Sequence, residues 1–190
     1  MQNTILIFNA SPRKEGNSSY LTGKILEGIR EKNPDASLEV INLHSMKIEP
    51  CRGCNACRAE NKKQPYCIIK DDMQDLYEKI VQSKAIVLVS PIYMFTVAAQ
   101  MKLFMDRING LAAEITLSLK DKPVGILLVY GDVDPYISGA INAIRTLQDF
   151  FRFWQSKILG IVYGSANDIG DAEKNRDLCE NAYNLGRMLG

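Results

Sequence analysis

Four short runs of apolar residues, none interrupted by a charge, constrain the fold of this 190-residue chain more than any other feature. They are Thr4–Phe8, Ala85–Val89, Val124–Tyr130 and Ile158–Tyr163. A continuous apolar run of this length predicts a strand buried on both faces, as in a parallel sheet with helices on each side. A fifth run, Leu38–Leu43, contains Glu39 and Asn42 and therefore predicts a partly exposed edge strand.

Segments with helical periodicity lie between these runs. Apolar residues recur three and four positions apart within 21–29, 76–81, 101–108, 137–147 and 178–189, and Gly110 stands where a helix C-cap would. Strands that alternate with helices predict an α/β fold with a doubly wound, five-stranded parallel sheet in the order 2-1-3-4-5. Ligands of such sheets bind beyond the carboxyl ends of the strands, where the strand order reverses. The loops after Phe8 and Val89 are therefore the candidate ligand loops.

Composition and charge narrow the possible functions. Hydrophobic residues make up 46% and charged residues 24% of the chain, as in ordinary globular proteins, and the length predicts one domain over residues 1–190. A net charge of +1 gives no reason to expect a nucleic-acid partner. The chain has no apolar run of the roughly 20 residues that a membrane span needs, and no basic segment of a signal peptide opens it. We therefore expect a cytoplasmic protein whose thiols stay reduced.

The first candidate ligand loop reads NASPRKEGNSS and leads directly into a helical segment. Hydroxyl, amide and guanidinium donors join a glycine and the free N–H groups of a helix start, which together suit an anion. The residues concerned are Ser11, Arg13, Gly16, Asn17, Ser18 and Ser19. The alternative is that Asn17 or Ser18 only caps the helix. No lysine stands at the position that the lysine occupies in a nucleoside-triphosphate-binding P-loop. The loop therefore predicts a site for a single phosphate.

The second candidate loop reads SPIYMFTVAAQMKLFMDRINGL from Ser90. With NASPRKEGNSS it resembles the NAD(P)H-dependent FMN reductases of the flavodoxin-like superfamily. Their first loop reads like S-P-R-x-x-G-N-[ST], and their second combines P-x-Y with K-x-F-x-D-R. The matching positions are Ser11, Pro12, Arg13, Gly16, Asn17, Ser18, Pro91, Tyr93, Lys102, Phe104, Asp106 and Arg107. The resemblance implies a flavodoxin-like fold, FMN as cofactor and NAD(P)H as cosubstrate.

The resemblance also implies roles by position. The first loop would hold the FMN phosphate, and Gly131 would let the backbone approach the flavin. The segment that would line the isoalloxazine, largely through backbone N–H groups, is Pro91, Ile92, Tyr93, Met94 and Phe95. Flavin N5 would carry the chemistry, so no side chain is predicted to be catalytic. For Tyr93 and Phe95, packing in the core is the alternative, and the K-x-F-x-D-R charges are expected to be structural and exposed.

Four of the five cysteines lie in CRGCNACRAENKKQPYC, within a loop over residues 50–72. These residues, Cys51, Cys54, Cys57 and Cys67, resemble the cluster ligands of iron–sulfur flavoproteins, a branch of the same family, but the last gap of nine residues is longer than in that pattern. Repeated x2 spacing favours a [4Fe–4S] cluster, while a cysteine-rich loop without metal, a zinc site and a disulfide remain alternatives. We expect these cysteines near the flavin of this chain or of a partner. Cys179 is interpreted as packing.

The sequence therefore predicts an FMN-dependent oxidoreductase that passes electrons between NAD(P)H or a reduced carrier and a small acceptor or redox protein. It indicates an iron–sulfur flavoprotein and, from the resemblance, a homodimer or higher homo-oligomer. One alternative is a cluster-free NAD(P)H:quinone, nitro or azo reductase. The other is a non-enzymatic electron carrier, although such carriers tend to be strongly acidic. The single histidine, His44, is interpreted as a surface or packing residue.

Overall fold

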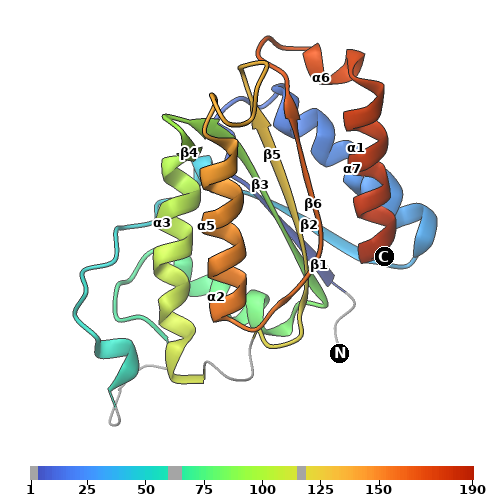
Figure 1. Ribbon diagram of the computed structural model, residues 1–190. Helices are drawn as coiled ribbons and strands as arrows, with labels where there is room; N and C mark the ends of the chain where they lie inside the picture. Colours follow the sequence, from blue (N-terminus) through green and yellow to red (C-terminus); the bar gives the residue numbers. More distant parts are fainter. Residues whose placement is uncertain (1–3, 60–65, 115–118) are drawn as a thin grey trace.

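The computed structural model describes residues 4–59, 66–114 and 119–190. Its centre is a parallel sheet in the order β2-β1-β3-β5-β6 (Figure 1). The strands are β1 (Thr4–Asn9), β2 (Ser37–Asn42), β3 (Ala85–Tyr93), β5 (Pro123–Tyr130) and β6 (Lys157–Ser165). This confirms the predicted α/β fold and its order of five parallel strands. A short strand that was not predicted, β4 (Thr96–Val97), pairs antiparallel with the end of β3.

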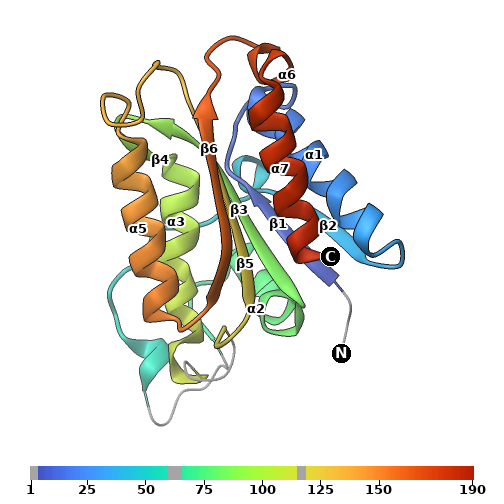
Figure 2. The same ribbon diagram turned by 45° about the vertical axis from the view of Figure 1, so that its right-hand side comes forward.

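Helices cover both faces of the sheet, as Figures 1 and 2 show. On one face lie α1 (Asn17–Lys32), α6 (Asp171–Lys174) and α7 (Arg176–Leu189); on the other lie α2 (Met73–Gln82), α3 (Ala99–Ile108) and α5 (Ala140–Phe153). Alternate residues of β1 point to opposite faces, so Ile5 and Ile7 pack under α1 and α7, while Leu6 and Phe8 pack on the other side. Among the described residues, no helix has the length and apolar character of a bilayer span.

Short 3-10 helices complete the fold: η1 (Leu43–Ser45), η2 (Ala56–Arg58) and η3 (Asn109–Glu114). His44, in η1, is exposed as expected. Gly110 lies inside η3, so its predicted role as a C-cap is wrong. A Cβ at Gly110 would lie 2.5 Å from the Tyr77 hydroxyl oxygen, and the glycine instead permits this close approach.

Two further sequence expectations need correction. The run Ile158–Tyr163 was predicted to be buried on both faces, but β6 is the second edge of the sheet and is only partly buried, with Tyr163 44% exposed. The helical pattern from Ile137 begins too early, because α5 starts at Ala140 and Ile137 is 64% exposed. Local periodicity shows neither that β6 lies at the edge of the sheet nor that a turn precedes α5.

Candidate functional site

A pocket opens at the carboxyl edge of the sheet, around the ends of β1, β3, β5 and β6. Its cavity volume is about 180 Å³, below the roughly 300–1,000 Å³ usual for small-molecule sites, and the pocket is open on one side. We call it the carboxyl-edge pocket. It is lined by Ser11, Arg13, Gly16, Asn17, Ser18, Pro91, Ile92, Tyr93, Val129, Tyr130, Gly131, Ala166 and Asn167. Most of the residues predicted to bind the cofactor therefore meet in one place.

The first loop is shaped by short-range hydrogen bonds. The Asn9 Oδ1 atom accepts the Ser11 backbone N–H at 2.9 Å, and the Ser11 Oγ atom accepts the Arg13 backbone N–H at 3.2 Å. Gly16 is the N-cap of α1, and no side chain caps the helix. The alternative that Asn17 or Ser18 caps α1 is therefore wrong. The positive end of the helix faces the pocket and can receive an anion.

Asn17 has a different role from the one predicted for its side chain. Its Nδ2 atom donates to the carbonyl oxygens of Ala166 at 3.0 Å and Asp168 at 2.9 Å, and its Oδ1 atom accepts the Ala172 N–H at 3.2 Å. The side chain thus fastens the loop after β6 to the start of α1. Asn17 forms the pocket wall, and what remains for an anion is its backbone N–H.

Replacing Asn17 by alanine should lower the free energy of unfolding by about 3 kcal/mol, at roughly 1 kcal/mol net for each of three hydrogen bonds. The affinities for FMN and riboflavin should fall together, because the variant loosens a wall that both ligands share. Urea unfolding of the apo-protein and titration with each flavin measure these effects. Asn181→Ala, at an exposed position in the helix of residues 176–189, is the control and should change both quantities little. A loss confined to FMN, with unchanged unfolding, would instead make the Asn17 side chain a phosphate ligand.

Three predicted residues do not line the carboxyl-edge pocket: Ser19, Met94 and Phe95. The Ser19 hydroxyl donates to the Arg13 carbonyl oxygen at 3.2 Å and accepts from the Asn9 Nδ2 atom at 3.4 Å, so it supports the first loop from behind. Met94 and Phe95 form the two-residue turn between β3 and β4, where Tyr93 pairs with Thr96. Their side chains are exposed at the pocket's rim.

The β3–β4 turn has an uncommon backbone. Met94 and Phe95 both have positive φ angles, 46° and 69°, as a type I′ turn requires. Non-glycine residues in this region cost about 1–3 kcal/mol each, and such strain concentrates at ligand sites. Tyr93 is 40% and Phe95 58% exposed, so the interpretation of these two rings as core residues is wrong. The turn is supported by Asn142, whose Nδ2 atom donates to the Phe95 carbonyl oxygen at 3.3 Å.

Apart from Gly131, the residues that line the pocket from the ends of β5 and β6 were not predicted. Val129, Tyr130, Ala166 and Asn167 line the pocket beside Gly131, where a Cβ would lie 2.7 Å from the Asn167 Oδ1 atom. A signal was present, because the polar residues after β6 also leave the sheet at its carboxyl edge. The same rule that selected the first two loops would have selected this one.

The four loop cysteines line a second hollow, which we call the cysteine hollow. Its other lining residues are Arg52, Gly53, Asn55, Ile68, Ile69, Asp106, Arg107, Asn109 and Gly110. Cys57 is buried, and burial raises the pKa of its thiol, with Cys67 adding to the shift. The Asn109 Nδ2 atom lies 3.9 Å from the Cys57 sulfur, as a donor to it. The described residues contain no ready-made group of three metal-ligating side chains.

A buried ion pair fixes the cysteine loop to α3. Asp71 accepts two hydrogen bonds from the Arg107 guanidinium, one of them from Nη2 at 2.9 Å. Arg107 also donates to the Glu49 carbonyl oxygen at 2.7 Å. The Arg107 side chain is 1% and the Asp71 side chain 5% exposed, so the expectation that Arg107 is an exposed charge is wrong. Lys102 and Asp106 do form the expected exposed pair, at 2.6 Å.

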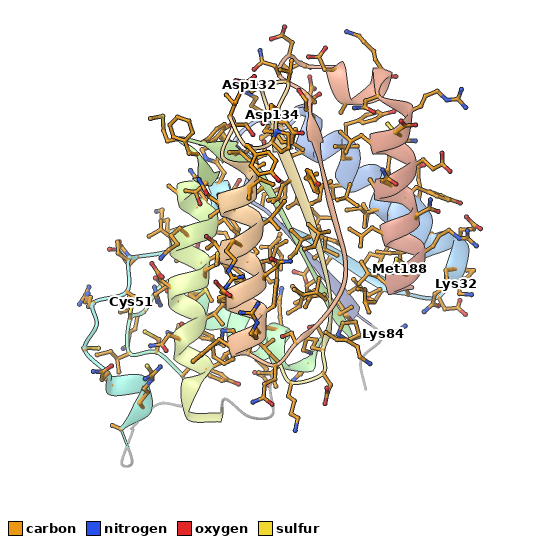
Figure 3. All side chains as sticks on the ribbon, in the orientation of Figure 1. Lys32, Cys51, Lys84, Asp132, Asp134 and Met188 are labelled. Atoms are coloured by element: carbon orange, nitrogen blue, oxygen red, sulfur yellow. The ribbon has the colours of Figure 1, made fainter. Side chains whose placement is uncertain are left out.

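The cysteine hollow lies away from this chain's own carboxyl-edge pocket, and the two share no lining residue. In Figure 3, Cys51 lies beside α3 on the left, while Asp132 and Asp134 mark the loop after β5 at the top of the molecule. The chain leaves β2 at the carboxyl edge but runs back along α3 to η2, where Arg58 donates to the Asn109 Oδ1 atom at 2.8 Å. Of the two expected positions for the cysteines, near the flavin site of this chain or near that of a partner, the first is therefore wrong.

The chain is similar in sequence to known proteins. Residues 3–168 match the family model of NADPH-dependent FMN reductases. The chain belongs to this family. An iron–sulfur flavoprotein of Methanocaldococcus jannaschii is 31% identical over 97% of this chain and 94% of its own length. An iron–sulfur flavoprotein of Archaeoglobus fulgidus is 31% identical over 83% of this chain and 69% of its own.

A solved structure supports the flavodoxin-like fold of this family member. The NAD(P)H:quinone oxidoreductase of Methanothermobacter marburgensis superimposes with a TM-score of 0.75 at 17% identity, covering 98% of this chain and 95% of the other. At that identity the likeness speaks for the fold alone. Family membership makes the protein an FMN-dependent NAD(P)H oxidoreductase.

Proposed function

We propose that this protein is an iron–sulfur flavoprotein that passes electrons between NAD(P)H or a reduced carrier and a small acceptor. The observation that carries the proposal is the meeting of all four loop cysteines at one hollow, although Cys67 is separated from the others in sequence. Soft thiolate ligands suit an iron–sulfur cluster. Cys51, Cys54, Cys57 and Cys67 would hold it.

The carboxyl-edge pocket fits FMN by the chemistry of its donors. The uncapped start of α1 and the Arg13 guanidinium would hold the phosphate, and Pro91 to Tyr93 with Gly131 would border the ring. FMN, when bound, supplies two-electron and one-electron chemistry. The protein's part is to hold the phosphate, to position the ring against backbone donors and to leave an open side at the exposed Tyr93–Phe95 turn.

We infer a homodimer from the separation of the two sites. The cysteine hollow lies away from the chain's own pocket, so electron exchange between cluster and flavin would use the flavin of a partner copy. This arrangement agrees with the exposed apolar residues at the pocket rim, among them Met94, Val133 and Tyr136. A cytoplasmic location is proposed with it.

A cluster-free NAD(P)H reductase is the second candidate. It is favoured by the absence, among the described residues, of three side chains already arranged around a metal position. The two candidates share the flavin site and differ in iron content. Iron and sulfide analysis of protein purified without oxygen separates them, and steady-state NAD(P)H oxidation separates both from an electron carrier.

Replacing Arg13 by glutamine should weaken FMN binding by roughly 1.5–3 kcal/mol, the usual worth of a hydrogen bond to a charged group, and leave riboflavin binding unchanged. Arg13 is exposed and donates within the chain only weakly, to the Asn167 carbonyl oxygen at 3.4 Å, so folding should not suffer. Flavin titrations at low salt measure both affinities, with Lys14→Gln as the matched control. Equal losses for both flavins would place the phosphate elsewhere.

A further inference from the structure

One buried donor in the cysteine hollow has no partner. Among the described residues, the Nε atom of Arg107 is the single buried side-chain nitrogen or oxygen without a hydrogen bond. The rest of the guanidinium is bonded: Nη1 donates to Asp71 and to the Glu49 carbonyl oxygen, and Nη2 donates to Asp71 at 2.9 Å. These bonds fix the guanidinium, so Nε cannot turn to solvent without breaking them.

An unpaired buried N–H is costly, at about 1–3 kcal/mol. Native proteins rarely keep such a group unless a water, an ion or a bound group supplies the acceptor. Arg107 lines the hollow together with all four loop cysteines, and within that lining the carboxylate of Asp106 is engaged by Lys102. Two asparagines also line the hollow, but the Asn109 Oδ1 atom accepts from Arg58 at 2.8 Å and Asn55 is exposed. The remaining side-chain acceptors of the hollow are the four cysteine sulfurs.

Cys67 and Arg107 line the same hollow. Burial lowers the pKa of Arg107, but the hydrogen bond to Asp71 outweighs it, and both Tyr77 and Cys67 add to the net rise. Tyr77 is held in turn by its hydroxyl, which donates to the Arg107 carbonyl oxygen at 2.8 Å. Gln74 fixes the Cys67 backbone, because its Nε2 atom donates to the Cys67 carbonyl oxygen at 2.9 Å. The positions of donor and sulfur are thus both set by the fold.

We propose that Arg107 is a positioning residue whose Nε–H donates a hydrogen bond to a sulfur of the iron–sulfur centre, either the Cys67 thiolate or a bridging sulfide. This proposal rests on the proposed function. Donors to cluster sulfurs stabilise the reduced, more negative state and so raise the reduction potential. Arg107 would set the potential at which the cluster exchanges electrons, in addition to anchoring the cysteine loop.

The test compares Arg107→Lys with Asp106→Asn in cluster-loaded protein. Lysine keeps a positive charge for Asp71 but has no group that corresponds to the Nε–H of arginine. We expect it to make cluster reduction about tenfold less favourable, a fall in midpoint potential of 59 mV for one electron. Asp106→Asn leaves the bonds of Arg107 intact and removes a negative charge from the same lining, so the potential should stay or rise. Spectroscopic redox titration measures both, and iron and sulfide analysis shows that each variant carries a full cluster.

The outcomes separate the two claims. If wild-type protein reconstituted without oxygen takes up no cluster, the proposed function fails and this inference fails with it. If wild type carries a cluster and Arg107→Lys leaves its potential unchanged, or raises it, the hydrogen bond is refuted while the cluster stands. If Arg107→Lys cannot hold the cluster at all, Arg107→Gln repeats the titration, and a potential equal to wild type again refutes the proposal.

Discussion

Replacing any one of Cys51, Cys54, Cys57 and Cys67 by serine should remove iron and sulfide from the protein together. Cluster ligation by four thiolates is cooperative, because an incomplete ligand set leaves an iron atom open to solvent and to loss. The expected result is a fall from a full cluster to stray iron in each variant after anaerobic reconstitution. Iron and acid-labile sulfide assays give the measurement.

Cys179→Ser is the matched control and should leave iron and sulfide unchanged. The Cys179 thiol lies on α7 and donates to the Ala172 carbonyl oxygen at 3.1 Å, far along the fold from the cysteine hollow. FMN should remain bound in all five variants, since none of these cysteines lines the carboxyl-edge pocket. Full iron content in any single variant of the four would remove that cysteine from the ligand set.

Replacing Asp71 by asparagine should destabilise the protein by about 3–5 kcal/mol, because it leaves the buried Arg107 charge without its partner. Asp106→Asn on the same helix as Arg107 is the control. Its pair with Lys102 is exposed and worth about 0–1 kcal/mol. Urea unfolding at neutral pH compares the two variants with wild type. Equal and small effects would contradict the structural role given to the buried pair.

The Asp71 effect should depend on pH in a definite direction. Burial alone would raise the pKa of Asp71, but hydrogen bonds from Arg107 and the Glu49 backbone N–H outweigh it, so the pKa is lowered in the folded protein. A lowered carboxyl pKa gives stability that is complete above the unfolded value of about 3.9 and is lost as the pH falls through the folded value. The difference between wild type and Asp71→Asn should therefore shrink in acid. A constant difference would contradict this assignment.

The strands of the central sheet could be predicted because burial on both faces leaves a continuous apolar run, which needs no tertiary information to recognise. The order of the parallel strands was predicted as the usual one for five strands in a doubly wound sheet. Residues of the first loop and of Pro91–Tyr93 reach the pocket for the same reason, since the carboxyl ends of parallel strands share one edge. These features depend on short sequence segments.

Features that depend on distant partners were missed. Arg107 is buried because Asp71, far away in sequence, pairs with it, and no local pattern marks that pair. Gly28 and Gly186 allow α1 and α7 to touch, since a Cβ at Gly186 would lie 2.1 Å from the Ile25 carbonyl oxygen. The β3–β4 turn was missed because Met94 and Phe95 occupy the two positions where such a turn usually has Asn-Gly. The path of the cysteine loop along α3 is likewise set by tertiary contacts.

The most direct test of the whole account is anaerobic reconstitution of wild-type protein with iron and sulfide, followed by quantitation of iron, sulfide and flavin in the same sample. We expect one FMN and one [4Fe–4S] cluster per chain, and we expect NAD(P)H to reduce the bound flavin and cluster. FMN with no more than stray iron, and undiminished NAD(P)H oxidation, would contradict the cluster and leave a plain flavin reductase.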